Sequence, residues 1–256
     1  MHLVAVHGYP LDHRLFGPLA DAASKGALGK VSSVFAPDLR GRGDSTRPAA
    51  PVHSMSLLAD DLAEDIAKAL PRDEPFVLAG LSMGGYVVFE FLRRHARLAG
   101  RIAGLALLDT KATADDEAGR AKRKEAIEAI RRDGIGAALT AMLPKLLAQG
   151  SKGGPAEETA RAMILATPPE TAMADLAGMA VRSEAFDVLG AFGGPILIAV
   201  GAEDTITPEA DAEAMAAAAA SARYVRFATI PGAGHLTPLE NPDEVARAIA
   251  DLSGRT

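Results

Sequence analysis

A serine flanked by glycines is the residue of this sequence whose surroundings best suit nucleophilic chemistry. Ser82 lies in the segment 80–84, GLSMG, directly after the apolar run Phe76–Ala79. Where a strand turns sharply into a helix, a serine on the turn points its hydroxyl outward, and glycines two residues away avoid a collision with the turn. The apolar segment 86–92 has the length and composition of a buried helix. This setting predicts that Ser82 is a nucleophile on a strand-to-helix turn.

Ser82 needs a base, because a serine hydroxyl attacks a carbonyl only when its proton is removed, usually by a histidine that a carboxylate orients. Of the six histidines, His235 is the best placed, since the glycine-rich turn PGAGH follows the strand-like segment 224–230. Asp204 follows the apolar segment 195–200 in the same way. The order serine, acid, histidine along the chain is also a known one. We therefore expect Ser82, Asp204 and His235 to form a catalytic triad.

Two other carboxylates compete for the position of the acid. Glu203 is the immediate neighbour of Asp204, and Asp109 follows the apolar segment 102–108, at another strand end from which such sites take their acid. We expect Asp204 rather than either of these.

Each of these residues also has a plainer interpretation. Taken singly, Ser82 fits a helix N-cap and His235 fits an ordinary surface loop. Their presence together, with an acid between them, favours catalysis. For His7 we expect the plainer role, a hydrogen bond that fixes a loop, because one histidine above the serine is sufficient.

Two backbone N–H groups are expected to stabilise the negative charge that attack places on the carbonyl oxygen. One N–H belongs to the residue after the nucleophile, and the other belongs to a loop after an earlier strand. These residues are Met83 and, in the HGYP loop at 7–10, Tyr9. We therefore expect the N–H groups of Tyr9 and Met83 to form an oxyanion hole.

Short apolar segments alternate with longer helical ones, which is typical of a parallel sheet with helices on both faces. The sequence thus predicts an α/β fold with a mainly parallel, six-stranded sheet. The expected strands are Leu3–Val6, Val31–Ala36, Phe76–Ala79, Ile102–Leu108, Ile196–Val200 and Tyr224–Thr229. The three site residues would follow the third, fifth and sixth of these.

Composition argues against several classes of function. The 256 residues suffice for one large α/β domain, carry a net charge of −6 and show no basic stripe, so binding to nucleic acid or to a membrane is not expected. Cysteine is absent, no histidine–carboxylate grouping has metal-ligand spacing, and the N-terminal apolar run stops at His7, too short for a signal peptide. We expect a cytoplasmic protein that acts on a small molecule without cofactor or metal. The sequence does not indicate an oligomeric state.

Taken together, the motifs resemble those of the α/β-hydrolase family. In chain order they are the HGYP loop at 7–10, PDLRGRGDS at 37–45, GLSMGG at 80–85, Asp204 and His235. The resemblance extends over nearly the whole chain and implies an α/β-hydrolase fold in which the segment 37–45 is a structural turn at the rim of the site. Within the family, the segments 80–87 and 232–240 are most similar to small serine carboxylesterases and 3-oxoadipate enol-lactonases.

The interval between the fourth and fifth predicted strands is too long for one crossover helix, and members of this family insert a helical cap there. The resemblance implies a core domain of residues 1–110 and 191–256 and a helical cap, or lid, of residues 111–190. We expect several helices in the cap. The glycine-rich segment 150–155 is expected to be a joint between them.

The resemblance also implies hydrolysis of a small carboxylic ester or lactone through an acyl-enzyme on Ser82. A serine there argues against dehalogenases and epoxide hydrolases of this fold, which use a carboxylate nucleophile. Leu236 argues against hydroxynitrile lyases, which carry a lysine after the catalytic histidine. Two alternatives stay open. One is a cofactor-free perhydrolase with the same triad, and the other is a non-catalytic small-molecule receptor of the same fold.

Overall fold

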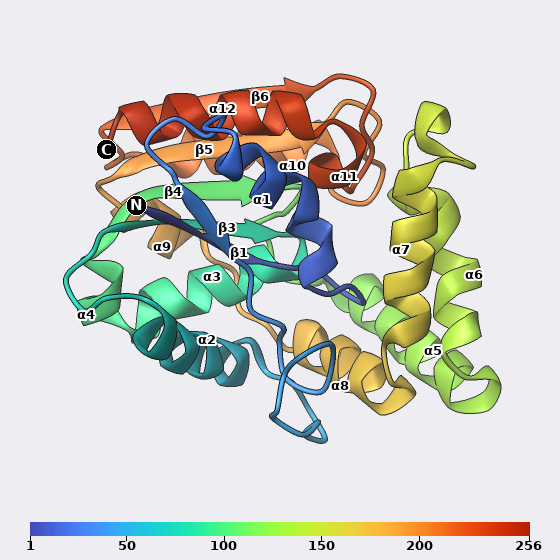
Figure 1. The fold of residues 1–256 in the computed structure, drawn as a ribbon. Coiled ribbons are helices and arrows are strands. Elements are labelled where there is room, and N and C mark those ends of the chain that lie inside the picture. Colours follow the sequence, from blue (N-terminus) through green and yellow to red (C-terminus); the bar gives the residue numbers. More distant parts are fainter.

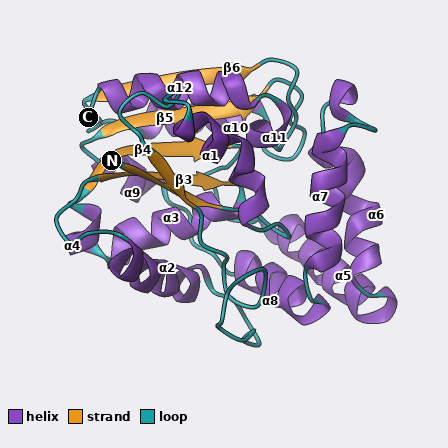
Figure 2. Ribbon diagram, in the orientation of Figure 1, coloured by secondary structure: helices purple, strands orange, loops and turns teal.

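Six parallel strands form the centre of the molecule, in the order β2-β1-β3-β4-β5-β6 (Figure 1, Figure 2). The computed structural model describes residues 1–256, except the side chain of Leu139. The strands are β1 (His2–Val6), β2 (Ser33–Phe35), β3 (Phe76–Leu81), β4 (Ile102–Leu108), β5 (Pro195–Gly201) and β6 (Tyr224–Ile230). Each neighbouring pair is parallel. The predicted α/β fold with a six-stranded sheet is therefore confirmed.

The second strand is shorter than the sequence predicts. The expected strand covers residues 31–36, but β2 spans Ser33–Phe35 and pairs with β1 alone. Val31 lies instead in a turn, where its N–H donates to the carbonyl of Leu28 at 3.2 Å and its side chain is buried. The apolar character of Val31 thus reflects a buried turn and not a position in the sheet.

Helices cover both faces of the sheet, so its central strands are apolar throughout. β3 and β5 are buried at every position. One face packs against α2 (Met55–Ala69), α3 (Met83–Arg94), α9 (Phe186–Ala191) and α10 (Glu209–Ala218). The other face packs against α1 (Gly17–Ser24) and α12 (Pro242–Gly254). Shorter helical turns are η1 (His13–Phe16), α4 (Ala96–Ala99) and α11 (Thr237–Glu240).

Two of the covering helices begin at residues that satisfy the free N–H groups of a first helical turn. The Ser54 hydroxyl accepts a hydrogen bond of 3.2 Å from the N–H of Leu57 at the start of α2. At the start of α12, the Asn241 side chain accepts one of 3.3 Å from the N–H of Glu244. Such N-caps typically stabilise a helix by about 1 kcal/mol, so these sequence positions fix where α2 and α12 begin.

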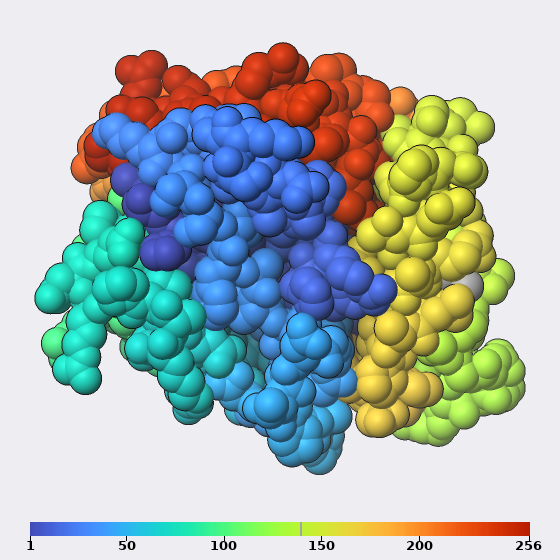
Figure 3. All heavy atoms as spheres, in the orientation of Figure 1, coloured from blue at the N-terminus to red at the C-terminus, as the bar shows by residue number. Residues whose placement is uncertain are grey.

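Helices also fill the long interval between β4 and β5. They are α5 (Glu117–Asp133), α6 (Ile135–Leu146), α7 (Pro155–Ala166) and α8 (Pro169–Ala180), with the short 3-10 helix η2 (Gln149–Ser151) between α6 and α7. In Figure 1, α5, α6 and α7 stand on the side to which the strand arrows point. In the space-filling view of Figure 3 the yellow part of this interval adjoins both the blue N-terminal loops and the red C-terminal segments.

The helical content of this interval agrees with the sequence analysis. The division into a core of residues 1–110 and 191–256 and a cap of residues 111–190 stays a prediction. Among the described residues, no helix combines the length and the apolar character that a membrane crossing requires.

Candidate active site

Ser82 lies on the turn between β3 and α3 in a backbone conformation that is rare for residues with a side chain. Its φ is 54° and its ψ is −118°. A non-glycine residue persists with positive φ only where the surroundings determine its conformation, and such residues cluster at functional sites. Here the N–H of Ser82 donates to the carbonyl of Leu108 at 3.0 Å. The Ser82 carbonyl accepts from the N–H of Gly85 at 2.9 Å and from the Thr110 hydroxyl at 2.7 Å.

The glycines around Ser82 are required by close packing of the backbone. A Cβ atom at Gly80 would lie 2.6 Å from the carbonyl oxygen of Gly84, and one at Gly84 would overlap the carbonyl of Val6. A Cβ at Gly8 would lie 3.1 Å from the Cβ of Ser82. The loop after β1 therefore passes directly beside the serine, as a site built from both loops requires.

Asp204 and His235 are in direct contact. Nδ1 of His235 donates to Oδ2 of Asp204 at 2.7 Å, and both side chains are buried. The same carboxylate also accepts hydrogen bonds from the N–H of Ile206 at 2.8 Å, from the N–H of Thr207 at 3.1 Å and from the Thr207 hydroxyl at 2.8 Å. The carboxylate is thus fixed in one orientation, with Oδ2 toward the imidazole ring.

The two groups shift each other's protonation in opposite directions. Burial alone would raise the pKa of Asp204, but the charge of His235 and the hydrogen bonds from His235 and Thr207 outweigh burial and lower that pKa. Burial alone would lower the pKa of His235, but the charge of Asp204 and its hydrogen bond outweigh burial and raise that pKa. Asp204 therefore favours a positive charge on His235, which is what a general base needs as it accepts a proton.

The segments that carry Asp204 and His235 touch where β5 ends in glycine. A Cβ at Gly201 would lie 2.5 Å from the carbonyl oxygen of Ala233. The N–H of Glu203 donates to that same carbonyl at 2.9 Å. Ser82, Asp204 and His235 thus follow β3, β5 and β6 at their carboxyl ends, the edge at which α/β sheets place ligands. Among the described residues the Ser82 hydroxyl has no hydrogen bond to His235, a contact that often tightens only when substrate is bound.

Tyr9 and Met83 lie on the two loops that meet at Ser82. Met83 is the first residue of α3, and the N–H groups of a first helical turn have no partner inside the helix. Tyr9 follows Gly8, whose backbone lies beside the Cβ of Ser82. The two N–H groups assigned to an oxyanion hole therefore belong to the residue after Ser82 and to the loop that passes beside it.

Comparison with known protein families assigns the chain to one of them. A model of the alpha/beta hydrolase family matches residues 3–248. The chain belongs to the alpha/beta hydrolase family.

Solved structures of this hydrolase family superpose on nearly the whole chain. An esterase from Thermogutta terrifontis, solved with malate bound, is 37% identical, with 98% of this chain and 88% of that one covered at a TM-score of 0.87. The enol-lactonase from Burkholderia xenovorans LB400 is 22% identical, with 98% and 90% covered at a TM-score of 0.82. A curated relative, the AB hydrolase superfamily protein YisY of Bacillus subtilis, is 31% identical over 93 residues, which are 36% of this chain and 32% of YisY. The chain thus matches about a third of the length of that relative.

In this alpha/beta hydrolase, His7 fixes a loop as predicted. The N–H of Leu39 donates to its Nε2 at 3.1 Å, and its Nδ1 donates to the carbonyl of Gly8 at 3.0 Å. Burial, followed by the charge of Arg42, lowers the pKa of His7 to about 4. His7 is therefore neutral at physiological pH, and both of its nitrogens are occupied by the backbone.

The two rival acids have other contacts. The Glu203 side chain is exposed and accepts a hydrogen bond of 2.9 Å from the N–H of Gln149, so it faces the α6–α7 connection. Asp109 is fully buried and contacts Gly201 and Thr237. Asp204 is the acid that contacts His235, as the sequence analysis expects.

The segment 37–45 of the hydrolase has the contacts of a structural turn, as the resemblance implies. The guanidinium of Arg42 is buried, forms an ion pair with Asp175 of α8 and donates to the carbonyl of Leu11 at 3.2 Å. The other oxygen of Asp175 accepts a hydrogen bond of 2.7 Å from Nδ1 of His53. This segment therefore ties α8 to the loop after β1.

The sequence did not indicate one cluster of side chains of the kinds that bind metal ions. Asp12, His13 and Asp38 each offer an atom within 4.8 Å of the others. The cluster forms because His13 donates to Asp38 through both Nδ1 and its backbone N–H, each at 2.7 Å, across 25 residues of sequence. Asp12 is already paired with Arg14, at 2.6 Å. Existing partners thus satisfy these ligand atoms within the protein.

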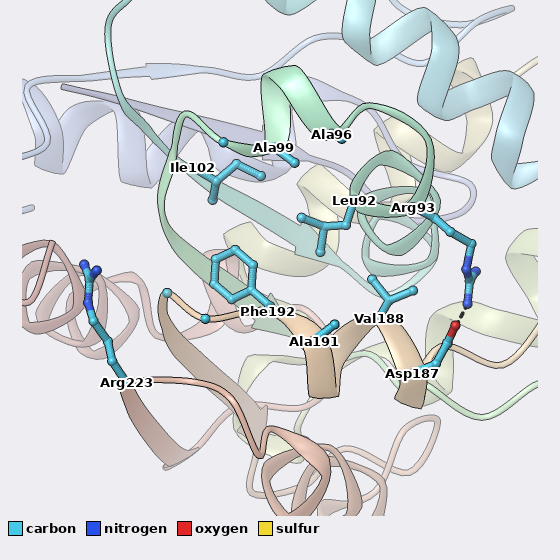
Figure 4. Close-up of a pocket in the computed structure, with 13 residues that line it drawn as sticks. Leu92, Arg93, Ala96, Ala99, Ile102, Asp187, Val188, Ala191, Phe192 and Arg223 are labelled. Atoms are coloured by element: carbon cyan, nitrogen blue, oxygen red, sulfur yellow. Dashed lines mark hydrogen bonds and ion pairs between the residues drawn. The ribbon is translucent and has the colours of Figure 1, made fainter.

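Figure 4 shows a groove of about 620 Å³ that is distant in the fold from Ser82. Its lining includes Ile102 and Arg223, which stand at the amino ends of β4 and β6. Figure 4 shows Phe192 and Ile102 on its walls and the ion pair between Arg93 and Asp187 at one end. Because Ser82, Asp204 and His235 follow carboxyl ends of strands, this groove is separate from the candidate active site.

Proposed function

We propose that this alpha/beta hydrolase cleaves a small carboxylic ester or lactone by a Ser82–His235–Asp204 triad. The observation that carries the proposal is the 2.7 Å hydrogen bond between His235 and Asp204, on two loops at the edge of the sheet where Ser82 follows β3. A neutral imidazole with one nitrogen oriented by a carboxylate has its other nitrogen free to act as a base. Ser82 is the nucleophile at hand, on a turn with a φ of 54°.

In the proposed reaction, Nε2 of His235 takes the proton of the Ser82 hydroxyl as the serine oxygen bonds to the carbonyl carbon. The carbonyl electron pair moves to the oxygen, where the N–H groups of Tyr9 and Met83 stabilise it. The imidazolium then gives its proton to the leaving alkoxide, and an acyl-enzyme results. Water repeats these steps on the acyl group and releases the acid, which restores Ser82.

The solved relatives support the ester or lactone class. The relative that is 37% identical is an esterase, and its structure superposes on 98% of this chain. The enol-lactonase superposes on 98% of this chain as well. We propose a small ester or lactone as the partner, with no metal or cofactor in the reaction. No contact among the described residues favours a perhydrolase or a receptor function over hydrolysis.

Residues 111–190 are proposed to be a cap over this site, on a core of residues 1–110 and 191–256. The N–H of His235 donates to the carbonyl of Leu146 in the interval at 2.8 Å. The Thr167 hydroxyl donates to the carbonyl of Pro10, next to Tyr9, at 2.9 Å. The interval therefore contacts both the histidine loop and the loop assigned to the oxyanion hole.

The test is hydrolysis of p-nitrophenyl esters of increasing acyl length, and of simple lactones, by the wild type and by Ser82→Ala. We expect Ser82→Ala to lower kcat by at least about 1000-fold. Ser221→Ala is a matched control, because Ser221 is exposed on a loop before β6. Equal turnover by Ser82→Ala and the wild type would disprove the proposal, and turnover that appears only with added peroxide would favour the perhydrolase.

A further inference from the structure

Asp109 is a buried carboxyl group that the proposed reaction does not use. It follows β4 directly, has no exposed surface, and adopts a φ of 46°. A positive φ at a non-glycine residue costs free energy and indicates that the surroundings hold the residue in place. The neighbours of Asp109 show what this position does.

Each oxygen of Asp109 accepts a hydrogen bond from a different loop of the proposed site. The N–H of Gly201 donates to Oδ1 at 2.9 Å, and the carbonyl of Gly201 accepts from the N–H of Asp204 at 3.0 Å. The hydroxyl of Thr237, two residues after His235, donates to Oδ2 at 2.5 Å. One carboxyl group therefore joins the Asp204 loop to the His235 loop.

The residues on either side of Asp109 hold the serine. The carbonyl of Leu108 accepts from the N–H of Ser82 at 3.0 Å, and the hydroxyl of Thr110 donates to the Ser82 carbonyl at 2.7 Å. A Cβ at Gly85 would overlap the Thr110 side chain, so glycine at position 85 permits this approach. Three consecutive residues at the end of β4 thus contact all three loops of the proposed triad.

Asp109 is also close to the two titratable members of the triad, Asp204 and His235. Burial, followed by the charge of Asp204, raises the pKa of Asp109 to about 8, and the opposite charge of His235 only partly offsets this. Asp109 is therefore mainly protonated at neutral pH. A protonated carboxyl keeps both contacts, because the Thr237 hydroxyl can donate or accept. Asp204 is then the ionised acid beside His235.

We propose that Asp109 is a positioning residue that sets the distance between the Asp204 loop and the His235 loop. This inference rests on the proposed function, since it concerns the same triad. What matters is a neutral group with one acceptor for Gly201 and one partner for Thr237. Asparagine meets that requirement, because its oxygen accepts from Gly201 and its amide nitrogen donates to the Thr237 hydroxyl.

The test compares Asp109→Asn, Asp109→Ala and Thr237→Val by ester hydrolysis and by proton NMR of the far-downfield signal from the Asp204–His235 hydrogen bond. An Asp204→Asn variant assigns that signal by its loss. We expect Asp109→Ala to lower kcat about 10- to 100-fold, the range for small displacements of catalytic groups, with KM little changed and the signal broadened or lost. Asp109→Asn should restore most of kcat and the signal.

Thr237→Val removes one of the two contacts and is expected to lower kcat about fivefold, the effect of one neutral hydrogen bond. If Asp109→Ala does not fold, Thr237→Val serves as the test of the positioning role. An unchanged signal and unchanged kcat in Asp109→Ala, or in Thr237→Val when the alanine variant is unfolded, would overturn the inference. An Asp109→Asn variant whose kcat and NMR signal are as impaired as those of Asp109→Ala would also overturn the inference. If the wild type shows no Ser82-dependent turnover, the proposed function fails, and the NMR signal alone decides the role of Asp109.

Discussion

Oε2 of Glu240 accepts a hydrogen bond of 2.7 Å from the N–H of Ala148, which ties the α6–α7 connection to the histidine loop. The other oxygen, Oε1, accepts from the N–H groups of Gly234 at 2.9 Å and Leu236 at 3.1 Å, on either side of His235. One carboxylate therefore fixes both the proposed base and a segment of the proposed cap. The predicted joint at 150–155 begins just after this tied segment.

Replacement of Glu240 is expected to loosen both contacts. In Glu240→Gln, at least one N–H that now has an acceptor would face an amide N–H₂ group, so we expect the free energy of unfolding to fall by about 1–3 kcal/mol. We also expect kcat to fall, because the His235 loop loses its support. Urea unfolding and ester hydrolysis measure the two effects. Glu213→Gln is the control, since Glu213 is exposed on α10, and equal behaviour of the two variants would contradict the prediction.

Asp204→Asn is expected to lower kcat about 10,000-fold, as for other triads in which an amide replaces the acid. The amide cannot stabilise the imidazolium that forms on His235, and it favours the wrong tautomer of the ring. Stopped assays with excess enzyme measure the residual rate. Asp73→Asn, at an exposed position before β3, should match the wild type. Wild-type turnover by Asp204→Asn would show that another acid serves His235.

The rate should fall at acid pH with a midpoint above 6.5, the ordinary pKa of histidine. Asp204 raises the pKa of His235 despite burial, and the base acts only when it is neutral. As the pH falls through this raised pKa, His235 becomes charged and kcat/KM decreases. A profile of kcat/KM against pH measures the midpoint in the free enzyme. A midpoint below 6.5 would contradict the electrostatic account.

Asp109→Asn is expected to stabilise the protein at alkaline pH relative to the wild type. The pKa of Asp109 rises from 3.8 in a solvated carboxyl to about 8 in the folded protein. The unfolded chain therefore releases this proton first, so wild-type stability falls as the pH rises from about 4 through 8. The asparagine variant has no such loss. Urea unfolding at pH 5 and pH 9 should show that the stability of Asp109→Asn relative to the wild type increases with pH. A difference between the two proteins that stays constant would contradict the prediction.

Gly84→Ala is expected to lower the free energy of unfolding by at least about 3 kcal/mol, or to prevent folding. The added methyl group would overlap the carbonyl of Val6, which is backbone and cannot rotate away. Gly150→Ala is the matched control, because a Cβ there meets no atom within 4 Å. Thermal unfolding of both variants checks the prediction, which a well-folded, wild-type-like Gly84→Ala protein would disprove.

The sequence by itself determined the sheet and the positions of Ser82, Asp204 and His235. Those predictions depend on local chemistry: buried parallel strands are apolar runs, and tight turns require glycine. The six expected strands correspond to β1–β6, and the shorter β2 differs because Val31 is buried in a turn. The three residues could be named because each lies in the turn or loop that follows such a strand.

Only the tertiary structure decided which side chains meet. Sequence left Asp109 and Glu203 as rivals of Asp204, and the 2.7 Å contact with His235 distinguishes Asp204 from both. Nothing in the sequence indicates that Asp109 meets Thr237, 128 residues away, or that Glu240 meets Ala148, 92 residues away. The physical reason is that hydrogen bonds form over about 3 Å, and such distances between remote residues depend on strand register and helix packing. Local patterns fix where each strand ends, and the assembled sheet fixes what lies beside that end.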